Sequence, residues 1–115
     1  MSRRDDSVPM RHMLDHAREV LLMVHGRTRQ NLDTDRMFQL ALTRLVEIIG
    51  EAAARVTAAG QARYRDIPWA QIVSTRNRIV HAYDTVDYDV VWDIATLEIP
   101  VLIASLERAL PGHVS

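Results

Sequence analysis

The chain has 115 residues, of which 48% are hydrophobic and 25% charged. This length and balance predict one folded domain over residues 1–115 and argue against a disordered chain. Cysteine is absent, which excludes disulfide bonds, a thiolate nucleophile and a cysteine-ligated metal. The sequence contains no signal peptide and no apolar run long enough to span a membrane, so we expect a cytoplasmic protein.

The distribution of charge is more informative than its sum. The formal net charge of −1 argues against a general nucleic-acid coat protein. All 14 basic residues are arginine, and between residues 61 and 81 Arg63, Arg65, Arg76 and Arg78 stand against one acid, Asp66. Two interpretations are open. The stretch is either a patch that holds RNA phosphates through guanidinium groups or a solvated, salt-bridged helix surface.

The first predicted helix runs from Val8 to His25, because apolar residues recur there at spacings of three and four. Gly26 is a suitable residue to end it. His12 and His16 have the i, i+4 spacing of a metal-binding pair, but no third ligand is evident beyond Asp15. We therefore expect an ordinary helix surface here, without a metal.

The second predicted helix begins near Asp33 or Thr34 and runs to about Ala59, before Gly60. Its apolar face is wide, and a face of that width usually packs on two sides. We expect one side to pack on the core and the other on a second protomer. Gly50 lies in the middle of this helix, where it costs about 1 kcal/mol relative to alanine. Close approach of another helix would explain that glycine.

The third predicted helix begins near Pro68 and runs to about Tyr83. Arg76 falls on its apolar stripe, where a cation is costly unless it is paired or functional. One interpretation is a structural ion pair with Glu47 or Glu51 of the second helix. The other is a functional cation. The stripe itself comprises Trp69, Ile72, Val73, Val80 and Tyr83.

His81 lies five residues after Arg76 and therefore on a different flank of the predicted helix, with Asn77 and Arg78 as its neighbours at i−4 and i−3. A histidine at a helix end is often a simple polar terminus. It is also the side chain best suited to proton transfer near neutral pH. Spacing alone leaves both interpretations open.

The fourth predicted helix starts with Asp87 as N-cap and runs to about Leu110, with a kink or break near Glu98 caused by Pro100. Asp84, Asp87 and Asp89 are interpreted as a turn and a cap, and Tyr88 and Trp92 as packing residues. No strand-like alternation is present. We therefore predict an all-α fold, a small antiparallel bundle of four main helices.

The segment Arg76-Asn77-Arg78-Ile79-Val80-His81-Ala82-Tyr83 resembles the R-x4-H-x-Y motif of the HepT toxins, which belong to the HEPN superfamily (DUF86-type). The resemblance extends upstream through residues 45–53 and 67–69 and downstream through residues 86–92. It covers nearly the whole chain.

The resemblance implies a metal-independent endoribonuclease that acts as a homodimer, with two third helices forming one RNA cleft. It makes Arg76 and His81 catalytic, with Asn77 and Arg78 in support. RNA supplies its own nucleophile, the 2′-OH, so no metal or cofactor is needed and the product is a 2′,3′-cyclic phosphate. His81 would transfer a proton, and Arg76 would stabilise the charge that develops on the phosphate.

The resemblance also implies a bacterial toxin–antitoxin pair whose antitoxin is a nucleotidyltransferase. In that family the motif tyrosine, here Tyr83, is implicated as the residue that the antitoxin modifies with AMP. The alternative is a non-catalytic HEPN module that binds a nucleotidyltransferase or a nucleotide. A plain helical assembly protein would leave Arg76 unexplained.

Overall fold

Helices form the regular structure of residues 5–110, the part of the chain that the computed structural model describes, apart from one antiparallel bridge between Val80 and Val86. This confirms the predicted all-α class. In chain order the elements are α1 (Ser7–Val24), α2 (Asn31–Thr34), α3 (Arg36–Ala54), α4 (Ala58–Arg63), α5 (Trp69–Val73), α6 (Thr75–Ile79), η1 (Ala82–Asp84), α7 (Tyr88–Asp93), η2 (Ile94–Glu98) and α8 (Ile99–Ala109).

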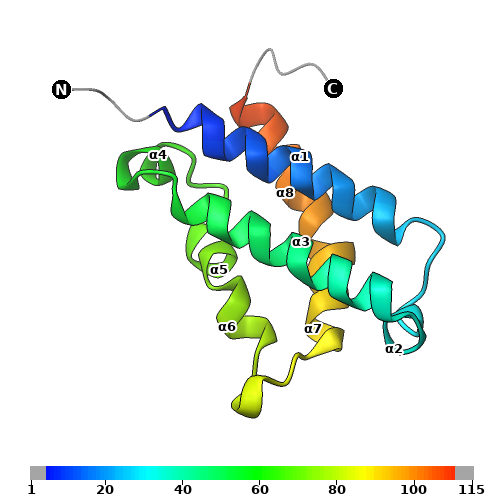
Figure 1. Ribbon diagram of the computed structural model, residues 1–115. Coiled ribbons are helices and arrows are strands. Elements are labelled where there is room, and N and C mark those ends of the chain that lie inside the picture. The colour runs from blue at the N-terminus through cyan, green and yellow to red at the C-terminus, as the bar shows by residue number, and fades with distance from the viewer. Residues whose placement is uncertain (1–4, 111–115) are drawn as a thin grey trace.

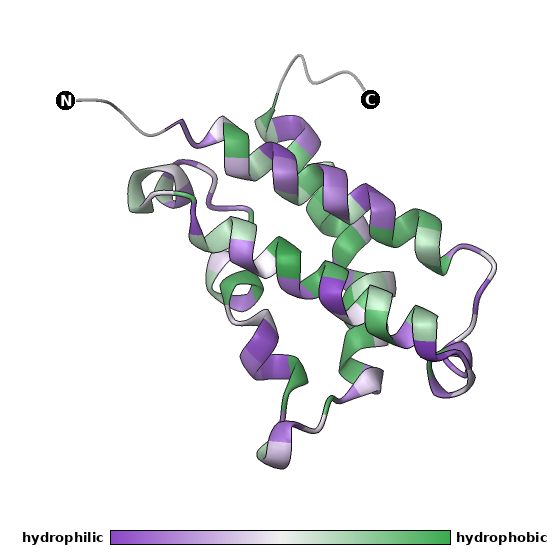
Figure 2. Cartoon of the chain, viewed as in Figure 1, coloured by the Kyte–Doolittle hydropathy of each residue, from purple (hydrophilic) through white to green (hydrophobic). Residues whose placement is uncertain are grey.

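The long helices α1 and α3 lie antiparallel and side by side (Figure 1). Helix α1 matches its predicted range within one residue at each end. It ends at Val24, and Gly26 follows two residues later with a φ of +74°, a left-handed conformation that glycine adopts without a Cβ penalty. Along α1 and α3 hydrophobic and hydrophilic residues alternate with the helical period (Figure 2).

The predicted second helix begins within two residues of its expected N-cap but is wrong at its C-terminal end. Asp35 is the N-cap of α3, and its side chain accepts the Phe38 N–H at 3.1 Å. The helix ends at Ala54, and α4 follows with its own N-cap, Thr57, whose hydroxyl accepts the Gly60 N–H at 3.1 Å. Gly60 therefore lies inside a new short helix and does not end the long one.

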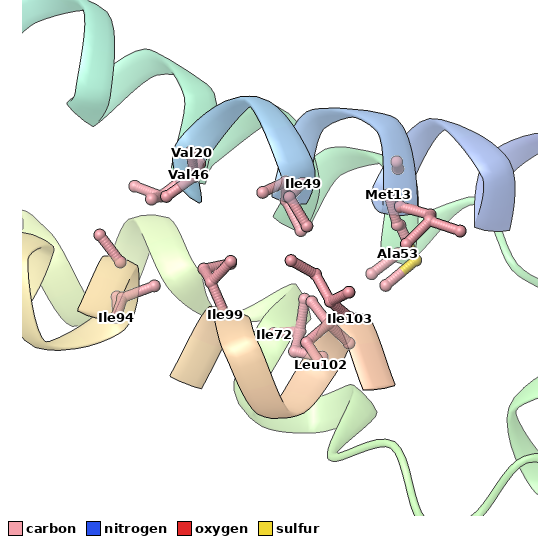
Figure 3. Packing of buried hydrophobic residues seen from close by; sticks show 14 of the residues in the cluster. Met13, Val20, Val46, Ile49, Ala53, Ile72, Ile94, Ile99, Leu102 and Ile103 are labelled. Carbon is pink, nitrogen blue, oxygen red and sulfur yellow. The ribbon is translucent and has the colours of Figure 1, made fainter. Parts of the chain in front are cut away.

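Much of the wide apolar face of α3 is covered within the chain, although Ala41 is exposed and Leu45 and Ile48 are only partly buried. Helix α1 packs on one part of it, and α5, α6, α7 and η2 pack on the rest. The core lies between these elements and α8 (Figure 3), where buried residues of α1, α3, α5, η2 and α8 meet, among them Met13, Val20, Val46, Ile49, Ile72, Ile94 and Leu102. Elements of the same chain therefore account for most of the width of this face, and its contact with a second protomer stays a prediction.

Gly50 is explained by a close crossing, as predicted. A Cβ built on Gly50 would lie 2.8 Å from the carbonyl oxygen of Ile72 and 3.2 Å from the Cβ of Thr75. These two residues belong to the junction between α5 and α6. A side chain at position 50 would force this junction away from α3.

The predicted third helix is shorter than expected and is divided at Ser74. The Ser74 hydroxyl donates to the Ala70 carbonyl at 2.7 Å, and the Thr75 hydroxyl donates to the Ile72 carbonyl at 2.6 Å. Such side-chain bonds to preceding carbonyls bend helices. The residues of this segment that face the core are Trp69, Ile72, Thr75 and Ile79.

The last predicted helix begins and breaks where expected. Asp87 is the N-cap of α7. Residues 94–98 form a π-helical turn, and α8 follows with Pro100 in its first turn. Proline has no N–H to donate and its ring crowds the carbonyl four residues earlier, so the α-helical pattern cannot continue through it. Within residues 5–110 no helix is long and apolar enough to cross a membrane.

Candidate functional site

The motif residues do not share one helix, because α6 ends at Ile79 and the chain enters a closed loop. The Asp87 N–H donates to the Ile79 carbonyl at 2.7 Å, and the His81 N–H donates to the Thr85 carbonyl at 2.8 Å. Together with the Val80–Val86 bridge, these bonds fix the two ends of the loop against each other. The loop forms the tip between α6 and α7 (Figure 1).

His81 lies at the start of this loop, outside the helix. Its side chain is 55% exposed, and its Nε2 is 3.1 Å from Oδ2 of Asp87. The predicted helical neighbourhood of His81 with Asn77 and Arg78 is therefore wrong, since the helical rule does not apply beyond Ile79. The structure brings His81 together with Asp87 instead.

Asp87 uses both carboxylate oxygens. Oδ1 accepts the backbone N–H groups of Asp89 at 3.1 Å and Val90 at 3.2 Å, while Oδ2 faces His81. The hydrogen bond with His81, followed by the bond from Val90, holds the pKa of Asp87 below its usual value of 3.8. The carboxylate is therefore ionised at neutral pH.

Arg76 is at the surface and not on the buried stripe. Its side chain is 74% exposed, and its Nη1 lies 3.7 Å from Oε2 of Glu47, which is only 16% exposed. The residues of this segment that face the core are Trp69, Ile72, Thr75 and Ile79, so the buried stripe runs beside Arg76 and does not include it. Of the two carboxylates considered as partners, Glu47 is the one nearby, and Glu51 pairs with Arg44.

The other two candidate cleft residues differ in environment. Asn77 is exposed on α6. Arg78 is half-buried, and its two terminal nitrogens donate to the two carboxylate oxygens of Glu98 at 2.9 and 2.5 Å. This ion pair joins α6 to η2 and raises the pKa of Arg78. Arg78 therefore holds α6 against η2, a structural role that the residue spacing in the sequence did not predict.

Tyr83 is fully exposed, so the expectation that it packs on the apolar stripe with Trp69 is wrong. Both Tyr83 and Asp84 have positive φ values, 63° and 57°, which non-glycine residues seldom adopt. The turn directs the phenol away from the core. Its side chain, including the hydroxyl, is therefore accessible to solvent.

A shallow groove of about 490 Å³ lies beside the site, between α3 and the loop. It shares Glu47 with the Arg76 ion pair and Asp84 with the His81 loop. Arg36 and Arg44 add basic groups to its wall. Its full lining is Arg36, Leu40, Thr43, Arg44, Glu47, Asp84, Val86 and Tyr88.

Sequence reasoning found the two exposed polar groups of the site but missed the carboxylate that contacts His81. Asp87 was identified only as a helix cap. The sequence offered one indication of this contact, an aspartate six residues after the histidine and across a turn. That spacing predicts a contact only when the pairing of Val80 with Val86 is known. His16, which has the spacing of a metal-binding pair with His12, forms a hydrogen bond with Glu19 on its own helix.

Comparison with known proteins identifies the family. The family model described as Ribonuclease HepT-like matches residues 13–109. The chain is 27% identical to a protein of Methanocaldococcus jannaschii named as a putative RNase, over 93% of this chain and 98% of the relative. It is 34% identical to a probable ribonuclease HepT of Thermococcus cleftensis, over 64% of this chain and 67% of the relative.

A protein of Caldanaerobacter subterraneus named as a putative RNase is 27% identical, over 88% of this chain and 90% of the relative. No solved structure matches the chain. The family match covers α1 from residue 13, all of α3 and the whole segment from α5 to α8, including the loop that carries His81. The protein therefore belongs to the HepT-like ribonuclease family of the HEPN superfamily.

Proposed function

We propose that this protein is a metal-independent endoribonuclease in which Arg76 and His81 act on the RNA phosphodiester. The observation that carries the proposal is the pair itself. A guanidinium and an imidazole are exposed on consecutive segments, α6 and the loop that follows it, and each is near a carboxylate from another element. Relatives named as RNases support the same class of substrate.

The reaction needs only groups that these side chains and RNA supply. The ribose 2′-oxygen forms a bond to phosphorus, and the P–O5′ bond breaks. A base removes the 2′-OH proton, and an acid gives a proton to the departing 5′-oxygen. His81 serves as base or acid. Arg76 stabilises the charge that grows on the phosphoryl oxygens, and Asn77 orients the phosphate.

The enzyme works as a homodimer in this proposal, so that two copies of His81 are available to one cleft. An exposed apolar patch supports this part of the proposal. Leu97 and Val101 are 67% and 65% exposed, and Val73 is also exposed. Leu97 and Val101 border an apolar pocket between α3, α5, η2 and α8, and soluble monomers seldom leave such patches uncovered.

We further propose that the protein is the toxin of a toxin–antitoxin pair and that a nucleotidyltransferase antitoxin adds AMP to Tyr83. The accessible phenol supports this step. Its oxygen would bond to the α-phosphorus of ATP, with pyrophosphate as the leaving group. The new phosphate, next to the loop that carries His81, would compete with RNA for Arg76.

Cleavage of a defined RNA by the purified protein tests the enzymatic proposal. Cleavage should persist in EDTA, leave a 2′,3′-cyclic phosphate and stop when the ribose at the cleaved position is replaced by deoxyribose. Arg76→Ala and His81→Ala should each lower the rate by about 10²–10⁴-fold. The matched control is His12→Ala, an exposed histidine on α1. Wild-type rates for His81→Ala would overturn the proposed site, and a protein that binds its partner without cutting RNA would be the non-catalytic module.

Co-expression with the neighbouring gene tests the modification. Intact-mass spectrometry should show the added AMP on wild type and none on Tyr83→Phe, which should remain toxic. The matched control is Tyr88→Phe, which retains the modification. A neutralised wild-type toxin without added mass would show instead that the partner inhibits by binding.

A further inference from the structure

Asp87 is held in place independently of His81. Its Oδ1 accepts two backbone N–H groups at the start of α7, from Asp89 and Val90. A carboxylate fixed by two such bonds cannot turn freely, so Oδ2 has a defined direction. That direction is toward Nε2 of His81, 3.1 Å away.

The backbone fixes the separation of the two residues. The bond from the Asp87 N–H to the Ile79 carbonyl and the bridge between Val80 and Val86 close the loop on both sides of His81. The His81–Asp87 contact is therefore a property of the fold and does not depend on two long, mobile side chains meeting at the surface.

Stability does not explain this contact well. The side chains of His81 and Asp87 are 55% and 33% exposed, and ion pairs at that exposure contribute little. An orienting role explains it better, because a carboxylate that accepts from one ring nitrogen decides which nitrogen carries the proton.

We propose that Asp87 is a positioning residue that holds His81 as the Nε2–H tautomer and leaves Nδ1 as the nitrogen that exchanges a proton with RNA. This inference rests on the ribonuclease activity proposed above. An ionised carboxylate only accepts hydrogen bonds, so a neutral His81 must carry its proton on Nε2 to bond with Asp87. The lowered pKa of Asp87 keeps that carboxylate ionised.

The assignment holds for either role of His81. As a base, Nδ1 takes the 2′-OH proton while the 2′-oxygen bonds to phosphorus, and the resulting imidazolium keeps its Nε2–H on Asp87. As an acid, the imidazolium gives its Nδ1 proton to the 5′-oxygen as the P–O5′ bond breaks. In both cases the Nε2 proton stays where it is.

Two substitutions separate orientation from helix capping, since Asn and Ser are both good N-caps. Asp87→Asn keeps the cap but presents an amide that can donate to His81. Asp87→Ser keeps the cap with a side chain too short to span the present contact. The matched controls are Asp35→Asn and Asp35→Ser, because Asp35 caps α3 in the same way.

Ring-nitrogen chemical shifts of the full-length, ¹⁵N-histidine-labelled protein at about pH 8.5 report the tautomer directly. Wild type and both Asp35 variants should show His81 as Nε2–H. Asp87→Ser should show a mixture, and Asp87→Asn a shift toward Nδ1–H. In RNA cleavage, both Asp87 variants should lower kcat by about 10–100-fold with little change in KM, and the Asp35 variants should match wild type.

An Nδ1–H tautomer in wild type, or an unchanged tautomer in both Asp87 variants, would overturn the inference. So would loss of activity in the Asp35 variants equal to that in the Asp87 variants, because capping would then be the whole effect. If wild type cleaves no RNA, the proposed function fails. The tautomer comparison still decides whether Asp87 positions His81.

Discussion

The two ends of the molecule are built by different means. Around α1 and α3, side chains such as Leu14 and Leu42 are fully buried and the fold is held by apolar packing. At the tip between α6 and α7, His81 and Tyr83 are exposed and the chain is held by backbone bonds and carboxylates. The groups suited to chemistry therefore contribute little to the packing. We expect substitutions at the tip to change activity and substitutions in the core to change stability.

The sharpest test of that separation contrasts His81→Ala with Leu42→Ala. We expect His81→Ala to lower the cleavage rate by about 10²–10⁴-fold, because a proton-transfer group is lost. Its effect on the free energy of unfolding should stay within about 0.5 kcal/mol, as for other surface changes. Urea unfolding and RNA cleavage of the same preparation measure both quantities.

Leu42→Ala should show the opposite behaviour. The side chain is fully buried in α3, and its truncation leaves a cavity that costs about 2.7–5 kcal/mol of unfolding free energy. Cleavage per folded molecule should remain near wild type. A large loss of cleavage per folded molecule in Leu42→Ala would show instead that the core and the tip are coupled.

Gly50→Ala tests the packing contact between α3 and the junction of α5 with α6. The new Cβ would meet the Ile72 carbonyl at 2.8 Å, and relief requires α5 and α6 to shift. We expect a loss of about 1–3 kcal/mol, as for other overpacked sites. Because Arg76 lies on α6, cleavage should also fall. Ala54→Gly, at the exposed end of the same helix, is the control for helix propensity.

Tyr83 should be replaceable with a gain in stability. A left-handed conformation costs a non-glycine residue roughly 1–2 kcal/mol, and this side chain is fully exposed. Tyr83→Gly should therefore raise the free energy of unfolding by about 1 kcal/mol, whereas Tyr83→Phe leaves it unchanged. Thermal unfolding measures both. Destabilisation by Tyr83→Gly would mean that the phenol ring has a packing role after all.

The contribution of Asp87 should depend on pH. Its pKa in the folded protein lies below the ordinary value of 3.8, so folding favours the ionised form. The stability that this supplies is fully present above pH 3.8 and is lost as the pH falls through the folded pKa. The difference in unfolding free energy between wild type and Asp87→Asn should accordingly shrink below about pH 4. A difference that grows in acid would contradict this sign.

Prediction from sequence worked where local chemistry decides the structure. The end of α1 before Gly26, the capping of α7 by Asp87 and the break before Pro100 each follow from one residue and its backbone preference. Prediction failed where two signals of similar strength compete. Periodicity continued through Ser74 and Ile79, and hydroxyl-to-carbonyl bonds and the Val80–Val86 pairing overrode it.

The sequence by itself determined the helical class, the apolar faces of α1 and α3 and the identity of the motif residues, because these depend on spacing and residue type alone. Three pairings could be seen only in the tertiary structure. Arg76 is exposed beside Glu47, Arg78 forms an ion pair with Glu98 that joins α6 to η2, and His81 contacts Asp87. Each of these pairs joins residues from different elements. Their contacts depend on where each helix ends and in which direction the chain continues. Both are decided by the sum of many small packing and hydrogen-bond energies over the whole fold.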